Sequence, residues 1–414
     1  MLRFLTAGES HGRALTVIVE GLPAGLWVTR DAIADELSRR RLGYGRGPRQ
    51  RFEEDEITLV GGVRHGRTLG SPVSVEIKNT EWFRSDVWHA EMSPEPGVSE
   101  RPLTQPRPGH ADLAGMQKYG FADARNVLER ASARETAARV VAGSLAKALL
   151  REIGTHVISH VVQLGSVRAG DRRPGPDDMF EVDESPVRCF DPDAAARMVS
   201  EIEAAAKDGD SLGCVIEVLA VGVPVGLGSY VHWDRRLDGL LARAIMSIQA
   251  VKGVEVGDGF EVAGRRGSAA HDPIEWDEAG RTYRRSSTLA GGTEGGMSTG
   301  EMLVVRAAMK PLATLNRPTL RTVDVVTKES TVSFKERTDV TAVPAMGVVA
   351  ETMVALVLAA EAQRKFGGDS VEEFTRNASA SRSALRLARR TRSPVGPSRA
   401  PSTGPSRRSS CSWA

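Results

Sequence analysis

Apolar and polar residues alternate at several places along the chain, a pattern typical of strands with one buried face. RALTVIVE (13–20) shows it and is followed by a Gly-Leu-Pro turn, and GSPVSVEIKN (70–79) shows it again. VIEVLAVGVPVGLG (215–228) and EMLVVRAAMKP (301–311) are more continuously apolar and also predict strands. Strands are therefore expected in both halves of the chain.

Four segments predict helices: 29–41, 132–154, 235–253 and 343–368. Thr29 is the expected N-cap of the first, whose three consecutive arginines favour the C-terminal end of the helix dipole. The last is long and apolar, with a proline in its first turn and a Gly-Gly pair at its end.

Strands and helices mix without a strict β-α-β alternation, which favours an α+β fold over a Rossmann sheet. Residues 92–109 are rich in Pro and Glu and predict a loop. After Asn377 the composition changes to ten Ser, eight Arg and four Pro in 38 residues. Such a composition is typical of disorder. We expect a folded part over 1–376 and a disordered basic tail over 377–414.

The tail also accounts for the calculated charge. The whole chain carries a formal charge of +2, and the eight tail arginines have no acidic residue beside them, so residues 1–376 carry −6. The folded part is therefore mildly acidic, and any cluster of arginines within it needs its own explanation.

Nothing near the N-terminus predicts export, because Arg3, Glu9 and Arg13 interrupt any signal-peptide apolar region. The apolar stretch 352–360 is bounded by glutamates and is too short to span a membrane. The three cysteines are widely spaced, which argues against a disulfide framework or a zinc site. We expect a cytoplasmic protein without a metal site.

TAGESHGRAL (6–15) places Ser10 and His11 between two glycines directly after an apolar run. The segment could form a tight turn. It could also bring backbone and imidazole close to a ligand.

RRRLGYGRGPRQR (39–51) contains six arginines and no acid. A solvated helix end explains it, and so does a site for carboxylate or phosphate, since the Arg fork binds both bidentately. Nucleic acid is a further ligand class, although only Tyr44 interleaves the arginines as a stacking platform would require.

TQPRPGHADLAGMQKYG (104–120) holds His110 on a loop stiffened by Pro106 and Pro108, next to the permissive Gly109. A histidine on a loop is commonly just exposed. A rigid loop is also where a functional side chain is held in place.

RASARETAAR (130–139) contains Ser132 and Glu135 at the spacing of a capping box. Arg130 and Arg134 put cations at the positive end of the predicted helix, which costs about 0.3–1 kcal/mol unless an anion binds there.

LAGGTEGGMSTGE (289–301) has five glycines, which would let backbone amides approach a phosphate or a planar ring. In KERTDVTAVPA (335–345), Arg337 and Asp339 precede the last predicted helix, which Asp339 or Thr341 could cap. Taken together, the segments indicate a polyanionic ligand and acid–base chemistry.

These segments, in order, resemble the chorismate synthase family, and the resemblance covers essentially residues 1–376 as a single catalytic domain. The matching motifs are GESHG (8–12), RPGHAD (107–112), ERASARETAAR (129–139), GVEVGDGF (253–260), GGTEGGMSTG (291–300), AAMKP (307–311) and RTDVTAVPA (337–345).

The resemblance implies the last step of the shikimate pathway, a 1,4-anti elimination of phosphate from 5-enolpyruvylshikimate 3-phosphate that gives chorismate. It implies a requirement for reduced FMN without net redox change, a β-α-β sandwich and a homotetramer. NADPH would enter only as a reductant of the flavin, and neither nucleic acid nor a membrane is an expected partner.

The resemblance also implies residue roles. His11 would donate a proton to the departing phosphate, and His110 would protonate the reduced flavin near N1. Asp339, with Ser10 and Ser132, would assist proton removal through flavin N5. The substrate would be held by Arg40, Arg46, Arg107, Arg134 and Arg337.

The flavin would rest on residues from five segments, and the glycines beside His11 would let phosphate and flavin approach. The implied flavin contacts are Arg130, Ala131, Ser132, Gln249, Ala250, Gly295, Lys310, Pro311, Leu312, Ala313, Thr314 and Arg337.

The sequence departs from the family pattern in three places, of which Thr341, standing where the family commonly has Cys, is harmless. Ala313 stands where the family often has a hydroxyl, which removes one hydrogen bond to the ligand. The tail after Asn377 replaces ordinary helical sequence, as a shifted reading frame or a genuine extension would.

Three other functions compete with this reading. A nucleic-acid-binding protein would use residues 39–51 and the tail, with salt-sensitive affinity and no flavin. A serine hydrolase built on Ser10 and His11 lacks the GxSxG turn. A flavin reductase would need a nicotinamide site, for which no dedicated motif is visible.

Overall fold

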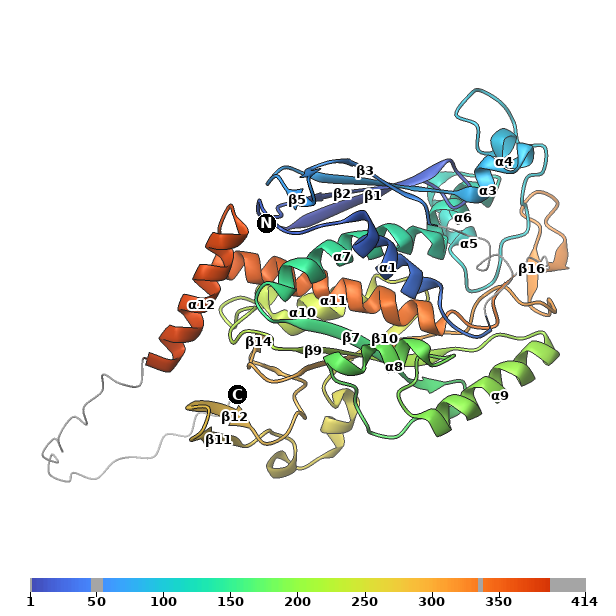
Figure 1. Ribbon diagram of the computed structural model, residues 1–414. Coiled ribbons are helices and arrows are strands. Elements are labelled where there is room, and N and C mark those ends of the chain that lie inside the picture. The colour runs from blue at the N-terminus through green and yellow to red at the C-terminus, as the bar shows by residue number, and fades with distance from the viewer. Residues whose placement is uncertain (1, 46–54, 334–337, 388–414) are drawn as a thin grey trace, which may run out of the picture.

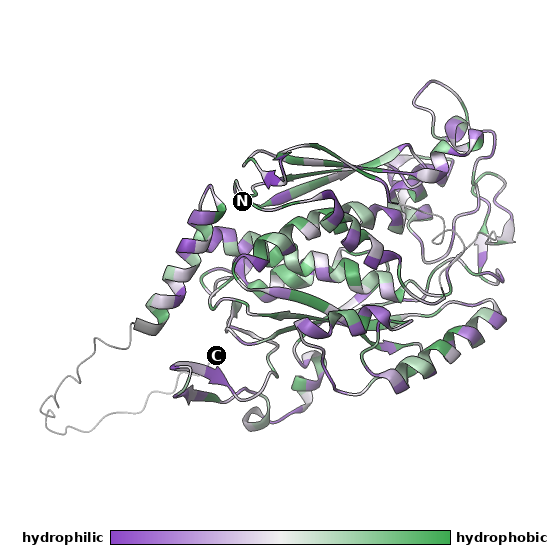
Figure 2. Ribbon diagram, in the orientation of Figure 1, coloured by the Kyte–Doolittle hydropathy of each residue, from purple (hydrophilic) through white to green (hydrophobic). Residues whose placement is uncertain are grey.

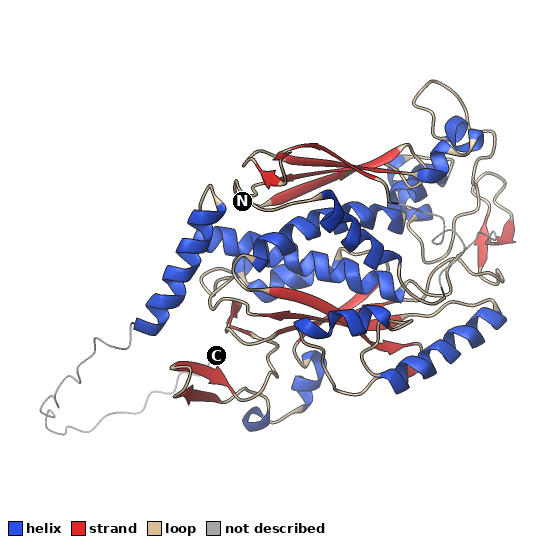
Figure 3. Ribbon diagram, viewed as in Figure 1, coloured by secondary structure: helices blue, strands red, loops and turns tan. Residues whose placement is uncertain are grey.

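The structure, a computed structural model, describes residues 2–45, 55–333 and 338–387 and has three layers (Figures 1 and 3). The first sheet has the order β1-β2-β6-β3 and the second the order β10-β15-β9-β7-β8. The helices α1, α7 and α11 lie between the two sheets. This arrangement confirms the expected α+β class and the β-α-β sandwich.

The strands of the two sheets are β1 (Arg3–Ala7), β2 (Ala14–Glu20), β3 (Ile57–Gly61), β6 (Val73–Lys78), β7 (His156–Leu164), β8 (Val167–Arg168), β9 (Cys214–Val221), β10 (Val251–Val256) and β15 (Leu303–Met309). Short hairpins are formed by β4 (Val63–Arg64) with β5 (Arg67–Thr68), β11 (Ile274–Asp277) with β12 (Thr282–Arg285), β13 (Thr293–Glu294) with β14 (Met297–Ser298), and β16 (Arg321–Val323) with β17 (Ser330–Val332).

The α-helices are α1 (Arg30–Arg41), α3 (Thr80–Phe83), α4 (Asp86–Glu91), α5 (Asp112–Tyr119), α6 (Arg125–Ala131), α7 (Thr136–Arg151), α8 (Met179–Glu184), α9 (Pro192–Asp208), α10 (Leu237–Met246), α11 (Val343–Phe366) and α12 (Val371–Leu387).

The first sheet forms because alternate residues of its strands are apolar. Val17 and Val19 of β2 pair in register with Val75 and Val73 of β6, and all four side chains are buried against the helical layer. The strands expected over 13–20, 70–79 and 301–311 are therefore confirmed as β2, β6 and β15.

The helical layer is packed closely around α11. A Cβ atom at Gly143 of α7 would lie 2.1 Å from the Cβ of Thr352 on α11, so only glycine allows the two helices to approach this far. Figure 2 shows apolar residues concentrated along these central helices and the strands beside them.

The helix α11 is long and apolar enough to cross a membrane by length and composition, so the expectation that this region is too short was wrong. Within the described residues it is the one helix with this property, and 89% of its apolar window is buried inside the protein. It is the core helix of the sandwich, which agrees with an apolar helix buried on all sides.

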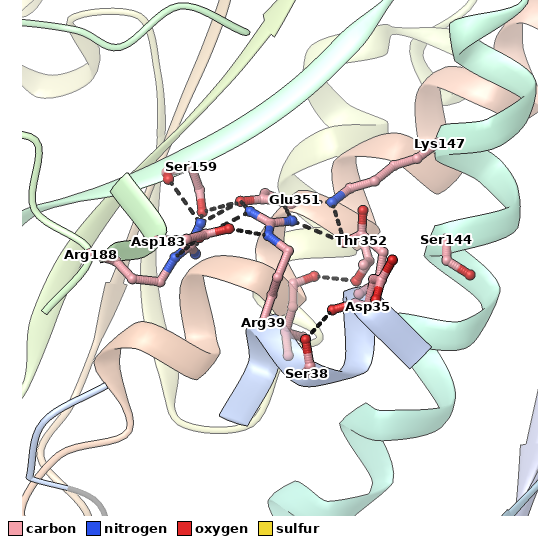
Figure 4. A network of polar contacts seen from close by, with 12 residues as sticks. Asp35, Ser38, Arg39, Ser144, Lys147, Ser159, Asp183, Arg188, Glu351 and Thr352 are labelled. Atoms are coloured by element: carbon pink, nitrogen blue, oxygen red, sulfur yellow. Dashed lines mark hydrogen bonds and ion pairs between the residues drawn. The ribbon is translucent and has the colours of Figure 1, made fainter. Parts of the chain in front are cut away.

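Six charged side chains meet inside the helical layer, and we call them the core charge network: Glu36, Arg39, Lys147, Asp183, Arg188 and Glu351. Glu351 is fully buried and accepts hydrogen bonds from Lys147 at 2.6 Å, Arg39 at 2.8 Å and Arg188 at 3.1 Å (Figure 4). Burial raises the pKa of Glu351, but the three cations outweigh burial and hold that pKa well below its usual range. The network joins α1, α7 and α11 to α8 and to the loop that follows it.

Two boundaries differ from expectation. The helix predicted over 235–253 ends at Met246, because the following residues turn and Val251 then pairs with Met309 as the first residue of β10. The tail predicted to be disordered from Asn377 begins as a helix, since α12 continues to Leu387. Its amphipathic start buries Phe374 and Ala378, which composition alone does not reveal. The rest of the tail, 388–414, lies outside the described residues.

Candidate active site

A pocket opens where the N-terminal end of α11 meets the start of α7. Its volume is about 180 Å³, below the range of roughly 300–1,000 Å³ usual for ligand sites, so the part bounded by the described residues holds only part of a large ligand. It is lined by Ser10, Arg40, Ser132, Ala133, Arg134, Thr136, Ile248, Gln249, Met309, Asp339, Ala342, Ala345, Met346 and Val349. Six of the predicted site residues thus converge from five separate chain segments.

Arg40 reaches the pocket from the last turn of α1. Its Nε donates to Thr136 Oγ1 at 3.0 Å and its Nη2 to the carbonyl of Ala133 at 3.1 Å. The side chain is buried, so these bonds fix the guanidinium at the pocket wall.

Arg134 has protein partners for its charge. Its guanidinium pairs with the buried carboxylate of Asp55, and Nε donates to Asn79 Oδ1 at 3.1 Å. The expected cost of this cation at the helix end is therefore offset by a distant carboxylate that the local sequence does not contain.

The capping box predicted at Ser132 is also only half present. Ser132 Oγ accepts from the backbone N–H of Arg134, but Glu135 does not return the bond. Its carboxylate accepts instead from Thr6, Arg139 and Gln249. Burial raises the pKa of Glu135, and Arg139 and these hydrogen bonds lower it further than burial raises it. Glu135 is a tertiary anchor rather than a cap.

Gln249 presents an unsatisfied acceptor at the pocket. Its Nε2 donates to Glu135 at 3.1 Å, which fixes the orientation of the amide, and its buried Oε1 has no hydrogen-bond partner. A buried acceptor left open costs free energy unless a ligand supplies a donor. Gln249 is therefore suited to accept from an N–H of a bound heterocycle.

His11 is held on three sides. Its Nδ1 lies 2.9 Å from Glu129 Oε1, its ring stacks on Trp88 with centroids 3.8 Å apart, and its Nε2 lies 3.6 Å from Glu81 Oε2. Beside it, Ser132 Oγ donates to Ser10 Oγ at 3.2 Å. The predicted acid His11 and the two predicted serines are thus neighbours.

Gly8, two residues before Ser10, allows the backbone to pack closely against another part of the chain. Gly8 has a φ of 98°, and a Cβ there would lie 2.2 Å from the carbonyl oxygen of Ala14. The space was expected to admit phosphate and flavin. The fold itself therefore requires glycine at this position, and the approach of a ligand to this turn stays a prediction.

His110 lies in a second cluster. Its Nδ1 contacts the fully buried carboxylate of Asp112, to which Arg107 Nε donates at 2.9 Å. Arg107 Nη1 also donates to Thr314 Oγ1 at 3.2 Å. Burial raises the pKa of Asp112, but hydrogen bonds from His110 and Arg107 lower it far below its ordinary value. The imidazole thus has a permanently charged acceptor.

The predicted flavin segment over 310–314 connects this cluster to the pocket. Met309 lines the pocket, Lys310 donates its backbone N–H to the carbonyl of Ala250 at 3.0 Å, and its Nζ donates to the carbonyl of Gly109. Burial and the charge of Lys252 lower the pKa of Lys310. Two histidine sites and one pocket therefore form a continuous region.

The remaining members of this segment pack on neighbouring backbone. Pro311 lies against Gly213, the carbonyl of Leu312 accepts from Ser211 at 2.8 Å, and Ala313 faces Gly109.

On the other side of the pocket, α6 ends at Ala131. Arg130 there donates to the carbonyls of Gly8 and Thr6, at 3.0 and 2.9 Å. Arg130 therefore ties the Ser10–His11 turn to the end of α6.

Two predicted residues lie outside the described part of the chain, and a third lies in a different part of the molecule from the pocket. Arg46 and Arg337 lie outside the described residues. Gly295 lies in the β13–β14 turn, whose next residue contacts Gly228, and Gly228 donates to Glu361 near the far end of α11. Glu361 is about 18 Å along the helix from Val349 at the pocket.

A second cavity has a larger volume than this pocket and lies elsewhere in the molecule. A cavity of about 870 Å³ runs along the outer face of the second sheet, where Arg173 and Arg306 pair with the buried Glu217. It contains none of the predicted site residues. Burial raises the pKa of Glu217, but His160 and Arg173 bring it to about 2.

Sequence reasoning missed Glu129, Asp112 and Trp88. Both carboxylates lie inside motifs of the family resemblance, RPGHAD and ERASARETAAR. Asp112 follows His110 by two residues, which is a local signal, but Glu129 is 118 residues from His11 and gave none. Trp88 gave no signal, since it reaches His11 only through the fold of 80–91.

A three-layer α+β fold with two carboxylate-paired histidines beside an arginine-lined pocket defines an enzyme suited to proton transfer on a small anionic substrate. The family model for chorismate synthase matches residues 2–362. The chain is 60% identical over 388 residues to the chorismate synthase of Thermobifida fusca (strain YX), covering 91% of this chain and 97% of that protein. It is 59% identical over 386 residues to that of Streptomyces coelicolor, with coverages of 91% and 96%.

A crystal structure of chorismate synthase superimposes with a TM-score of 0.75 at 39% identity, covering 93% of this chain and 98% of that chain. The chain belongs to the chorismate synthase family.

Proposed function

We propose that this protein is a carbon–oxygen lyase that converts 5-enolpyruvylshikimate 3-phosphate to chorismate and phosphate, the last step of the shikimate pathway. In this elimination one ring carbon loses a proton, another loses phosphate, and a new carbon–carbon double bond forms. The observation that carries the proposal is the pairing of His11 and His110 with the buried carboxylates of Glu129 and Asp112 beside one pocket.

The residues present fit reduced FMN. The pocket has an apolar wall that includes Ile248, Met309 and Met346, and Gln249 Oε1 is a buried acceptor without a donor. Such a wall suits a planar ring and such an acceptor suits a ring N–H. The flavin would be held by this wall, by Gln249 and by the ends of α6 and β15.

When bound, reduced FMN would supply the electron density that helps break the carbon–oxygen bond, with no net redox change. Arg40 and Arg107 would bind the carboxylates and phosphate of the substrate. His11 would give its proton to the departing phosphate, and His110 would hold a proton at flavin N1. Asp339, at the pocket wall with Ser10 and Ser132, would assist removal of the ring proton.

We further infer a homotetramer in the cytoplasm that takes its reduced flavin from outside, with NADPH only as a reductant. The substrate is a small molecule, and neither nucleic acid nor a membrane is a partner. The core position of α11 supports the last point, because the apolar window of that helix is buried inside the sandwich.

An anaerobic assay tests the proposal. Purified protein is mixed with dithionite-reduced FMN and 5-enolpyruvylshikimate 3-phosphate, and chorismate absorbance and released phosphate are followed together. We expect equal amounts of both products, and none with oxidised FMN. Phosphate without chorismate, or product formation independent of flavin, would contradict it.

The double variant His11→Ala/His110→Ala is the matched control for the two roles. Its FMN affinity should stay within about tenfold while turnover collapses, since a general acid contributes roughly 10²–10⁴-fold. Near-normal turnover in this variant would show that the two imidazoles are not the acids.

A further inference from the structure

One buried carboxylate fixes both the backbone and the ring of His11. Glu129 Oε2 accepts the backbone N–H of His11 at 2.8 Å, and the two carboxylate oxygens lie 2.9 and 3.1 Å from Nδ1. The carbonyl of the same residue accepts the backbone N–H of Ser10 at 3.0 Å. Glu129 therefore determines where the Ser10–His11 turn lies and how the imidazole is rotated.

The carboxylate is itself charged and buried. Burial raises the pKa of Glu129, but the hydrogen bonds from His11 and the charge of Arg125 lower it more, so it is ionised at neutral pH. A carboxylate in this state only accepts hydrogen bonds. Nδ1 of His11 must then carry a proton in both charge states of the ring.

The other faces of the ring agree with this assignment. Trp88 stacks on it at an interplanar angle of 12°, and the guanidinium of Arg125 lies over the indole and 3.4 Å from Glu129. Nε2 faces the carboxylate of Glu81 on α3 at 3.6 Å, so the ring's second nitrogen points toward an anion that is partly exposed. Among the residues that the structure describes, the charged groups around the ring include Glu129 and Arg125 of α6 and Glu81 of α3.

We propose that Glu129 is the positioning residue of His11, which locks the proton on Nδ1 and leaves Nε2 as the atom that gives its proton to an anionic group of the substrate. The geometry rests on Glu129, and its use in turnover rests on the function proposed above. An oxygen of the leaving phosphate would take the place of the Glu81 carboxylate at Nε2. The proton then leaves from Nε2, and the neutral ring keeps its Nδ1–H bond to Glu129.

Nitrogen-15 NMR of histidine-labelled protein without any ligand tests the tautomer directly. His11→Ala identifies the His11 signals among the eight histidines of the chain. In the unsubstituted protein the neutral ring should be the Nδ1–H tautomer. In Glu129→Leu, which removes the acceptor at similar volume, the Nε2–H form should become the major one.

Glu91→Leu is the matched control. Glu91 also lies near Arg125, with its Oε2 3.8 Å from Arg125 Nε, but the described contacts of His11 do not include it. The tautomer of His11 should be unchanged in this variant. An Nε2–H tautomer in the unsubstituted protein would overturn the proposal even if Glu129→Leu failed to fold, and so would equal shifts in the two variants.

Turnover gives a second readout in Glu129→Gln, which keeps the shape and removes the charge. We expect kcat to fall about 10- to 100-fold while KM stays within threefold. We also expect the decline of kcat at high pH to begin at least one pH unit lower than in the unsubstituted protein. A fall in kcat without a change in the pH profile would overturn the role in proton transfer. If the unsubstituted protein forms no chorismate but shows the Nδ1–H tautomer, only the proposed function fails.

Discussion

Arg39 and Arg40 are neighbours on the last turn of α1, yet they belong to two different regions. Arg39 points into the core charge network, where its Nε lies 2.6 Å from Asp183 and its Nη1 2.8 Å from Glu351. Arg40 points to the pocket, where its described hydrogen bonds go to the neutral oxygens of Thr136 and Ala133.

The two regions differ in how charge is balanced. The network contains three cations and three carboxylates, each hydrogen-bonded to at least one group of opposite charge, so its charges neutralise each other without a ligand. At the pocket, the described hydrogen bonds of the Arg40 guanidinium go to the hydroxyl of Thr136 and the carbonyl of Ala133. A buried charge needs compensation, which the network supplies from its own side chains, so we infer that the network stabilises the fold. Under the proposed function, Arg40 would bind the anionic substrate.

The comparison predicts the largest loss of stability at Glu351. Glu351→Gln leaves Arg39, Lys147 and Arg188 facing one carboxylate fewer inside the protein. The free energy of unfolding should fall by ~3–5 kcal/mol, the usual cost of breaking a buried ion pair. Urea denaturation measures this loss, and the kcat/KM of the folded enzyme should stay within threefold.

Arg40→Met should reduce activity strongly and stability only slightly. Losing charge-assisted hydrogen bonds worth ~1.5–3 kcal/mol to the substrate lowers kcat/KM by about 10- to 100-fold. The free energy of unfolding should fall less than in Glu351→Gln, because the core charge network stays intact. If Arg40→Met destabilises the fold more than Glu351→Gln does, the division between the two regions is wrong.

Lowering the pH should reduce the difference in unfolding free energy between Glu351→Gln and the unsubstituted protein. The folded state holds the pKa of Glu351 well below its ordinary value, so its contribution is complete above the unfolded pKa and is lost as pH falls. Below about pH 4.3 the gap in unfolding free energy should shrink by ~1.4 kcal/mol per pH unit. Denaturation at pH 4.5 and 3.5 measures it, and a gap that is constant with pH would contradict the assignment.

A surface ion pair should give the smallest change in stability. Glu20 contacts Arg3 between two side chains that are 47% and 77% exposed. Glu20→Gln should change the free energy of unfolding by only ~0–1 kcal/mol, since water screens such pairs. A loss close to that of Glu351→Gln would mean that burial is not what distinguishes the network.

Much of the fold could be predicted because short segments carry their own signals. Alternation along 13–20 and 70–79 predicted two neighbouring strands of the first sheet, and Thr29 caps α1 by accepting from Ala32 N–H as expected. The helix end at Met246 was missed, because pairing of Val251 with Met309 depends on a strand more than fifty residues away.

The candidate site was predicted in part for the same reason. Ser10, Ser132, Gln249 and Asp339 were selected by motif, and the fold brings them to one pocket. The partners Glu129 of His11 and Asp112 of His110 were not assigned, although both lie within the motifs. Residue type alone does not show which acid reaches which ring.

By itself the sequence determined the elements, the family, and the residue types of the site: two histidines, several arginines and an aspartate in ordered motifs. Only the tertiary structure decided which groups each arginine side chain contacts. Three consecutive arginines end α1, and successive side chains of a helix project about 100° apart. Arg39 therefore enters the core network, Arg40 faces the pocket, and Arg41 lies 4.0 Å from Asp55. The sequence shows one run of arginines, and the packing of α7 and α11 around it sends one of them to the core charge network and the next to the pocket.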